Sequence, residues 1–180
     1  TWPDVRTFYS GIYLEDNITF TKKTSAKFSG RIGVQNNRIA SDFGLGSLQI
    51  FYPNLTASKT RMLPSFSAQI IHKKKRYTFT NSLGYGERAP SVSEGYGNFL
   101  YNSFDNFDYI GNPNLKNEKS LELNSKIAYK KNNFSFTFDN SFFYISDYII
   151  GEINNNYSPM VIGASGVKVY SSLDKVLQFN

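Results

Sequence analysis

The chain has 180 residues, a formal net charge of +6 and a pI near 9.4, and it contains no cysteine. Disulfides and thiolate sites are therefore excluded within these residues. Phe and Tyr are abundant, with 16 and 13 copies, and both favour strands. No run of about 18 apolar residues is present, so the sequence contains no transmembrane helix, although membrane-crossing strands need apolar residues only at alternate positions.

The basic residues gather in short polar turns rather than on one face. The turns contain Lys22-Lys23, Lys73 to Arg76, and Lys130-Lys131. A nucleic-acid site would combine a basic face with stacking aromatic rings. This distribution favours solvated turns, and we expect no nucleic-acid partner.

The first half of the chain contains three predicted strands, at residues 6–20, 24–35 and 60–72. In the second strand, Ala26, Phe28, Gly30, Ile32 and Val34 alternate with Ser25, Lys27, Ser29 and Arg31. The first strand is ambiguous because both of its faces carry apolar groups. Pro64 predicts an irregular or edge-like position near the start of the third strand. Residues 36–59 are rich in Asn, Ser and Gly and predict a long loop.

The second half contains four more predicted strands, at residues 76–87, 119–130, 133–148 and 166–173, with long loops at 88–117 and 151–163. The strand at 133–148 alternates most clearly. Since successive strand side chains point to opposite faces, one face of it is apolar and the other polar. The two sets are Phe134, Phe136, Phe138, Asn140, Phe142 and Tyr144 against Ser135, Thr137, Asp139 and Ser141.

Strand length and connection length together favour a membrane barrel over a soluble sandwich. The strands run to roughly 11 to 15 residues, whereas soluble strands average about five or six. Short turns and long loops also alternate strictly, as expected when turns lie on the periplasmic side and loops outside. The predicted fold is all-β, an antiparallel transmembrane β-barrel of which this chain supplies about seven strands. A soluble sandwich with a lectin-like end is the alternative.

Several motifs around the long central loop follow one another in a recognisable order. They are Leu83-Gly-Tyr-Gly-Glu-Arg-Ala-Pro-Ser91, Glu94-Gly-Tyr96 and Gly111-Asn-Pro-Asn-Leu-Lys-Asn-Glu118. This order resembles the barrel of TonB-dependent outer membrane receptors, with Asn117 where that family usually has Pro. Tyr13-Leu-Glu-Asp16, Phe28-Ser-Gly-Arg-Ile32, Met62-Leu-Pro-Ser65 and the strand from Phe142 to Ile150 are similar to other strands of the family. After Ile150 the resemblance fades.

The resemblance implies a barrel of about 22 strands with a plugged lumen, located in the bacterial outer membrane. Residues 1–180 then form part of the barrel domain, and nothing in them resembles the plug domain or the TonB box. The start of the chain lacks the basic and apolar regions of a signal peptide, so we expect a mature or truncated form. The implied function is active uptake of a scarce ligand, a siderophore, cobalamin, metal or glycan. The implied partners are outer membrane lipid, a TonB-type energy-coupling protein and that ligand.

The long loop at 88–117 carries the candidate binding residues, because loops on rigid scaffolds often bind ligands. Arg88 and Glu118 flank this loop. They contact either the plug or substrate in the lumen, or each other as an ion pair that fixes the base of the loop. The aromatic residues either cap a ligand from outside or pack against one another. The candidates are Arg88, Tyr96, Phe99, Tyr101, Phe104, Asp105, Phe107, Asp108 and Tyr109.

Catalytic and metal chemistry find little support in the sequence. His72 is the only histidine and lies beside a lysine turn, so we expect it to be exposed and not catalytic. Asp105 and Asp108 have the oxygen ligands that calcium prefers, but their spacing matches no known site. We predict no enzyme activity, metal site or cofactor. The alternative function is a small stand-alone barrel whose external loops are adhesive or structural.

Overall fold

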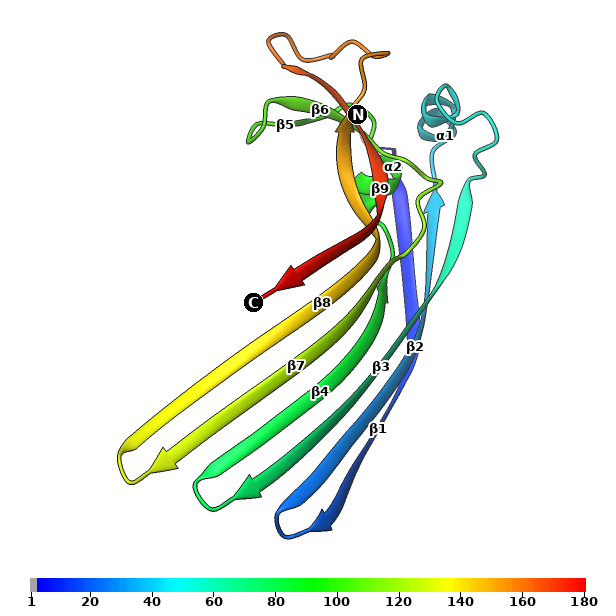
Figure 1. Ribbon diagram of the computed structural model, residues 1–180. Helices are drawn as coiled ribbons and strands as arrows, with labels where there is room; N and C mark the ends of the chain where they lie inside the picture. Colours follow the sequence, from blue (N-terminus) through cyan, green and yellow to red (C-terminus); the bar gives the residue numbers. More distant parts are fainter. Residues whose placement is uncertain (1–2) are drawn as a thin grey trace.

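The computed structural model describes residues 3–180, which form long hairpins in one curved sheet (Figure 1). The sheet order is β1-β2-β3-β4-β7-β8-β9-β6-β5. Among the described residues β1 pairs only with β2, so the sheet is open. The strands are β1 (Val5–Thr21), β2 (Thr24–Ile39), β3 (Ser58–Lys74), β4 (Tyr77–Arg88), β5 (Leu100–Asn102), β6 (Phe107–Ile110), β7 (Glu118–Lys131), β8 (Phe134–Ile153) and β9 (Gly166–Phe179), and the helices are α1 (Asp42–Gln49) and α2 (Val92–Tyr96).

The two ends of the sheet differ as the sequence predicts. The hairpins β1-β2, β3-β4 and β7-β8 all turn at the lower end in Figure 1, and the long connections lie together at the opposite end. Lys75 and Asn132 adopt positive φ angles of 56° and 51°, a conformation that tight hairpin turns require. The predicted alternation of short turns and long loops is confirmed.

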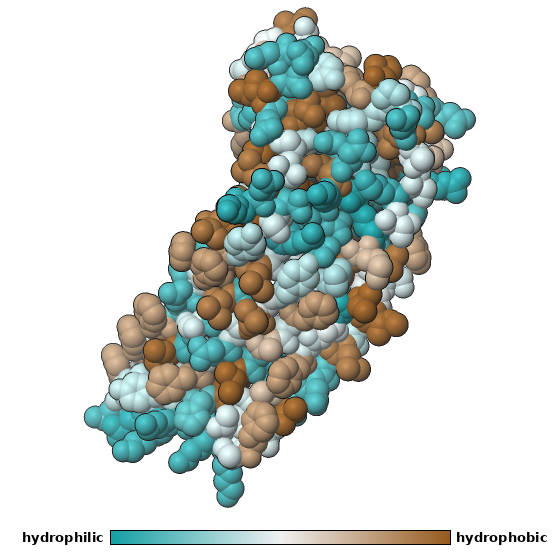
Figure 2. Space-filling model, turned by 45° about the vertical axis from the view of Figure 1, so that its right-hand side comes forward, coloured by the Kyte–Doolittle hydropathy of each residue, from teal (hydrophilic) through white to brown (hydrophobic). Residues whose placement is uncertain are grey.

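Strand pairing places the apolar side chains of the long hairpins on one face. Ile12 lies opposite Ile32, Phe66 opposite Tyr85, and Leu83 opposite Leu123. Figure 2 shows apolar residues over the lower sheet, bounded by hydrophilic turns below and a polar belt above. This apolar face is exposed, which is the arrangement of a barrel wall in lipid. Its members with more than two-fifths of their surface exposed include Ile12, Leu14, Ile32, Phe66, Leu83, Leu123, Phe136 and Phe138.

The opposite face of the same strands, the polar face, carries small and charged side chains. Ser29 and Ser67 hydrogen-bond across strands at 2.7 Å, and Ser67 lies opposite Gly84. Gly84 in turn lies opposite Glu122. A continuous polar surface therefore backs the apolar one, as in the lumen of a barrel.

A small hydrophobic core lies at the loop end. Ile39, Leu48 and Tyr96 are buried together, although they come from β2, α1 and α2. Ile39 shares the parity of the polar face, so α1 and α2 fold over the loop end of that face. In the residues that the structure describes, no helix has the length and apolar character needed to cross a membrane.

The prediction that residues 88–117 form only a loop is wrong, because they contain α2, β5 and β6. The prediction of a loop over 36–59 is also wrong in part, since β2 continues to Ile39 and α1 follows. The sheet is not wholly antiparallel either, because β6 pairs with β9 in parallel. These short elements depend on tertiary contacts such as the Ile39–Leu48–Tyr96 cluster, which no local periodicity encodes.

The long strands match their predicted positions, but several run further than predicted. β8 continues to Ile153 and β9 to Phe179, beyond the predicted ends at Tyr148 and Leu173. Pro64 occupies the edge-like position that its missing N–H requires, because β3 pairs with β4 only from Ser65 onward.

A charge placed on the apolar face tests the assignment of the two faces. Leu83 and Ser82 are neighbours in β4 but point to opposite sides of the sheet. We expect Leu83→Arg to cost about 2–4 kcal/mol of folding free energy in lipid, the range for Arg near the bilayer midplane. Ser82→Arg should be tolerated, because this side chain meets water. Folding equilibria in lipid vesicles measure both, and equal effects would contradict the assignment.

Candidate functional site

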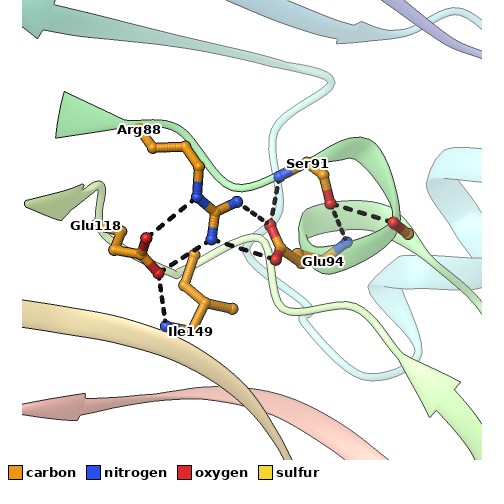
Figure 3. A network of polar contacts seen from close by, with 6 residues as sticks. Arg88, Ser91, Glu94, Glu118 and Ile149 are labelled. Carbon is orange, nitrogen blue, oxygen red and sulfur yellow. Dashed lines mark hydrogen bonds and ion pairs between the residues drawn. The ribbon is translucent and has the colours of Figure 1, made fainter. Parts of the chain in front are cut away.

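Arg88, at the end of β4, binds two carboxylates at the base of the long loop (Figure 3). Its Nη1 donates to Glu94 Oε2 at 2.8 Å, and its Nη2 donates to Glu118 Oε2 at 3.1 Å. Its Nε donates to Glu118 Oε1 at 3.3 Å. The planar guanidinium therefore holds carboxylates on two of its edges, a geometry that an ammonium group does not reproduce. The predicted Arg88–Glu118 pair is present, and it fixes the loop base.

The two carboxylates extend this network to further elements. Glu94 Oε2 accepts from the Ser91 backbone N–H at 2.6 Å, which completes a capping box on α2. Glu118 Oε2 accepts from the Ile149 backbone N–H in β8 at 3.2 Å. Burial alone would raise the pKa of the Glu94 carboxyl, but hydrogen bonds from Arg88 and Ser91 lower it below its usual value. The network thus ties β4, α2, β7 and β8 together.

The loop closes tightly against α2 through its Gly-Asn-Pro motif. The Gly111 N–H donates to Gly97 O, and the Asn112 N–H donates to Glu94 O, both at 2.7 Å. A Cβ on Gly111 would lie 2.5 Å from the Gly97 nitrogen, so a side chain does not fit there. This contact explains why the motif begins with glycine.

A depression of about 420 Å³ lies on the polar face directly below the Arg88 network. Small residues on adjacent strands line it, because Ser65 lies opposite Gly86 and Ser67 opposite Gly84. Arg88, Glu118, Ser120 and Glu122 also line it. The lining is rich in hydrogen-bonding groups, and the depression has room for a polar segment or molecule.

Two aspartates attach the outer loops to β6 and β9. Asp105 Oδ2 accepts from Lys168 Nζ at 2.7 Å and from the Tyr109 hydroxyl at 2.5 Å. These hydrogen bonds lower the pKa of the Asp105 carboxyl. Asp108 is fully buried, and its Oδ2 accepts from the backbone N–H groups of Met160 and Val161. Asp108 therefore holds the 154–165 loop against β6, and Asp105 ties the β5-β6 turn to β9.

The predicted binding residues divide into outward-facing and structural groups. Phe104 is fully exposed and Tyr101 is 44% exposed, so both point to solvent at the loop end. Tyr96 is buried in the small core. Phe99 packs against Phe51, with ring centroids 6.0 Å apart. The remaining aromatic candidates also pack inward: the Lys168 ammonium lies over the Phe107 ring at 4.4 Å, and the Tyr109 ring lies 5.1 Å from the Tyr170 ring.

Besides Glu94, the second partner of Arg88, sequence reasoning missed three residues of this region. Phe51 packs against both Phe99 and Tyr157, with the Tyr157 ring 5.3 Å away, so three long loops meet in one aromatic cluster. Lys168 is the cationic partner of Asp105. The Phe51-Tyr52 pair was a readable aromatic signal inside a polar loop, whereas Lys168 and Tyr157 carry no local signal. Within residues 3–180, no group of three or more His, Cys, Asp or Glu side chains is placed to hold a metal ion.

Comparison with known proteins gives one family and a consistent fold. The family model described as TonB dependent receptor-like, beta-barrel matches residues 1–173. The copper transporter OprC superposes with a TM-score of 0.72 at 15% identity, over 98% of this chain and 25% of that one. The siderophore receptor PirA from Pseudomonas aeruginosa gives a TM-score of 0.54 at 9% identity, over 96% of this chain and 38% of that one. No curated protein matches.

The chain belongs to the TonB-dependent receptors and forms part of their β-barrel. Members of this family lie in the bacterial outer membrane and act as receptors and transporters rather than enzymes. The chain spans about a quarter of the OprC chain that it matches.

Loss of the Arg88 hydrogen-bond network should destabilise α2 at the base of the loop without unfolding the sheet. We expect Arg88→Met to destabilise α2 locally by about 1–2 kcal/mol, since several charge-assisted hydrogen bonds are lost from a half-exposed side chain. Amide hydrogen exchange across residues 91–97 measures this effect. Lys116→Met removes an exposed cation from the same loop and is the matched control. Unchanged exchange in Arg88→Met would contradict the role of the network.

The ion pair between Asp105 and Lys168 should persist at acid pH, below the ordinary pKa of an aspartate. Because the folded pKa of Asp105 is lowered, the pair stabilises the loop above the unfolded value of about 3.9. That stability is lost as pH falls through the folded pKa. Carboxyl-carbon NMR titration should give a midpoint below the ordinary Asp value, and Lys168→Met should raise it. A midpoint that does not move in Lys168→Met would disprove the pairing.

Proposed function

We propose that this chain is part of an outer membrane receptor that takes up a scarce ligand by energy-coupled transport. The observation that carries the proposal is the division of one sheet into an exposed apolar face and a polar face whose loop end is covered by α1 and α2. A wall of this kind separates lipid from a hydrated lumen. The family match supports the same role.

In this proposal, residues 1–180 are one section of the barrel domain, and the polar face meets a plug domain elsewhere in the protein. The depression beneath Arg88 supports that contact, because Ser and Gly leave space while Glu122 offers a carboxylate to a polar partner. A TonB-type protein in the inner membrane would supply the energy. The stand-alone barrel is less well supported. A closed barrel would require β1 to pair with β9, whereas among the described residues β1 pairs only with β2.

The outer loops are the proposed ligand-contacting surface. Tyr101 and Phe104 are its outward-facing members, because their rings are exposed at the tip of the β5-β6 hairpin. Asp105, Phe107, Asp108 and Tyr109 hold this hairpin against the 154–165 loop and β9. Exposed rings on a fixed backbone can contact a ligand with little loss of conformational entropy.

The ligand class proposed first is a metal or a metal chelate. The two structural neighbours are described as a copper transporter and a siderophore receptor. Cobalamin and glycans remain in the panel to be tested, since the family resemblance also implies them.

Binding and uptake by the full-length receptor test the proposal. Purified receptor is titrated with a copper salt, a ferric siderophore, cobalamin and an oligosaccharide, and cells are assayed for uptake of whichever is bound. We expect Tyr101→Ala with Phe104→Ala to weaken binding by about tenfold or more, because exposed aromatic anchors often dominate such interfaces. Phe43→Ala, which removes an exposed ring from α1, is the control. If the receptor binds none of the four probes, the proposed ligand classes are wrong. If the double variant binds its ligand with unchanged affinity, these loops do not form the binding surface.

A further inference from the structure

The turn end of the sheet, the lower end in Figure 1 and Figure 2, is strongly basic. Eight of the 20 Lys and Arg residues lie in its three tight turns, and none of these turns contains Asp or Glu. All eight residues are exposed, and within residues 3–180 none of them is in an ion pair. These residues, the turn-end cations, are Lys22, Lys23, Lys73, Lys74, Lys75, Arg76, Lys130 and Lys131.

The stagger of the hairpins brings the three turns to one depth in the membrane. Thr24 begins β2 and pairs with His72, and β3 continues two residues beyond that pair. Further across the sheet, Tyr77 begins β4 and pairs with Tyr129, and β7 again continues two residues beyond the pair. Two residues of about 3.3 Å for every two strand spacings of about 4.8 Å incline the line of turns by about 35° from the perpendicular to the strands. Barrel strands are tilted by about 35–45°, so the line of turns runs nearly parallel to the membrane.

Two of the turn-end cations point to the lipid side of the wall, at the level of an aromatic girdle. Lys74 lies opposite Tyr77 and Lys131 lies opposite Phe134, all with the parity of the apolar face. The Tyr129 ring lies 4.9 Å from the Tyr77 ring and 6.2 Å from the Phe134 ring. Tyr is typical of the boundary between acyl chains and headgroups, because one end of its ring is apolar and the other polar. The ammonium groups of Lys74 and Lys131 therefore lie at the depth of the headgroups.

We propose that this end of the wall binds anionic phospholipids of the membrane leaflet that faces the periplasm. A phosphate group supplies the negative charge that the turns lack, and Lys binds phosphate as a compact point charge. Anionic headgroups attract each Lys or Arg that lies near the membrane surface. A soluble acidic protein would meet the turns from the aqueous side, whereas Lys74 and Lys131 face the lipid. The proposal rests on the barrel wall and is independent of the transported ligand.

The luminal side of the same turns provides a matched comparison. Lys73 lies opposite Thr78, and Lys130 lies opposite Ser135, with the parity of the polar face. These two cations therefore point toward the lumen, although each is the sequence neighbour of a lipid-facing cation. Removal of either pair lowers the net charge by the same amount. A difference between the two pairs therefore reports the direction of the side chains and not the total charge.

Tryptophan quenching in lipid vesicles tests the surface at its own position. Tyr77→Trp places an indole beside Lys74 in the full-length receptor, and the signal is the difference from the receptor without this substitution. Brominated phosphatidylglycerol should be preferred over brominated phosphatidylcholine at this site by about fivefold, the effect of one cation near an anionic surface. Lys74→Gln with Lys131→Gln should bring the ratio close to one, whereas Lys73→Gln with Lys130→Gln should leave it nearly unchanged. Equal quenching by the two lipids before any lysine is replaced, or an equal loss in both double variants, would overturn the proposal.

Three further measurements use no lysine variant. Salt at about 1 M shortens the Debye length to about 3 Å, so the lipid preference should fall toward one, and an unchanged preference would contradict the proposal. Native mass spectrometry of the wild-type receptor from mixed vesicles should show more bound phosphatidylglycerol than phosphatidylcholine, and equal retention would refute lipid binding even if the variants fail to fold. Binding of soluble polyglutamate without any lipid preference would assign the turns to an acidic protein and would also overturn the proposal. Since no transported ligand is present in these measurements, their failure is distinguishable from failure of the proposed uptake.

Discussion

The absence of water in a bilayer core is the constraint on which this structure depends. Every backbone N–H and C=O that crosses the core must find its partner within the protein, which leaves paired strands as one of two solutions. β2, β3, β4 and β7 meet this requirement, because each pairs with a long strand on both sides. The same pairing fixes which side chains share a face, so the register of β4 against β7 also sets the contrast between Leu83 and Ser82. Lipid contact and luminal chemistry are therefore consequences of one hydrogen-bond pattern.

The loop end of the sheet is stabilised by different interactions. There the loops form the only hydrophobic cluster found among the described residues, around Leu48 and Tyr96. The Arg88 network joins α2 to three strands, β4, β7 and β8. Asn117, where the family usually has Pro, contributes as well. Its amide donates to Met62 O at 2.8 Å and to Glu87 Oε2 at 2.9 Å, so it ties the end of the loop to β3 and β4. The β5-β6 hairpin, with the exposed rings of Tyr101 and Phe104, lies at this same end of the sheet.

Much of the sheet was predictable because the signals for long strands and tight turns lie within a few neighbouring residues. Alternation of side chains, as in residues 134–144, identifies a strand, and Lys or Asn pairs identify the tight turns. The positions of α1, α2, β5 and β6 were not predictable in this way. β6 is only four residues long and pairs in parallel with β9, more than fifty residues later in the chain, so its conformation follows from a distant contact. Strand ends near the loops were underestimated for the same reason.

The candidate site was partly predictable too. The Arg88–Glu118 pair follows from two residues that flank one loop, and the structure contains it. Glu94 was missed as the second partner of Arg88, although Ser91 and Glu94 have the spacing of a capping box that the sequence displays. Among the aromatic candidates, the sequence could not separate the exposed Phe104 from the buried Tyr96, because that difference arises only when α2 packs on β2.

An accessibility scan along β4 would test the central claim most directly. Nitroxide labels at each position from 78 to 87 of the full-length receptor in lipid would be exposed in turn to oxygen, which concentrates in the bilayer, and to a water-soluble nickel chelate. The two-faced wall predicts opposite period-two profiles, with oxygen favoured at the odd positions, which include Phe79, Leu83 and Tyr85, and the chelate favoured at the even positions. Profiles that rise and fall together, or chelate access at Leu83, would contradict it.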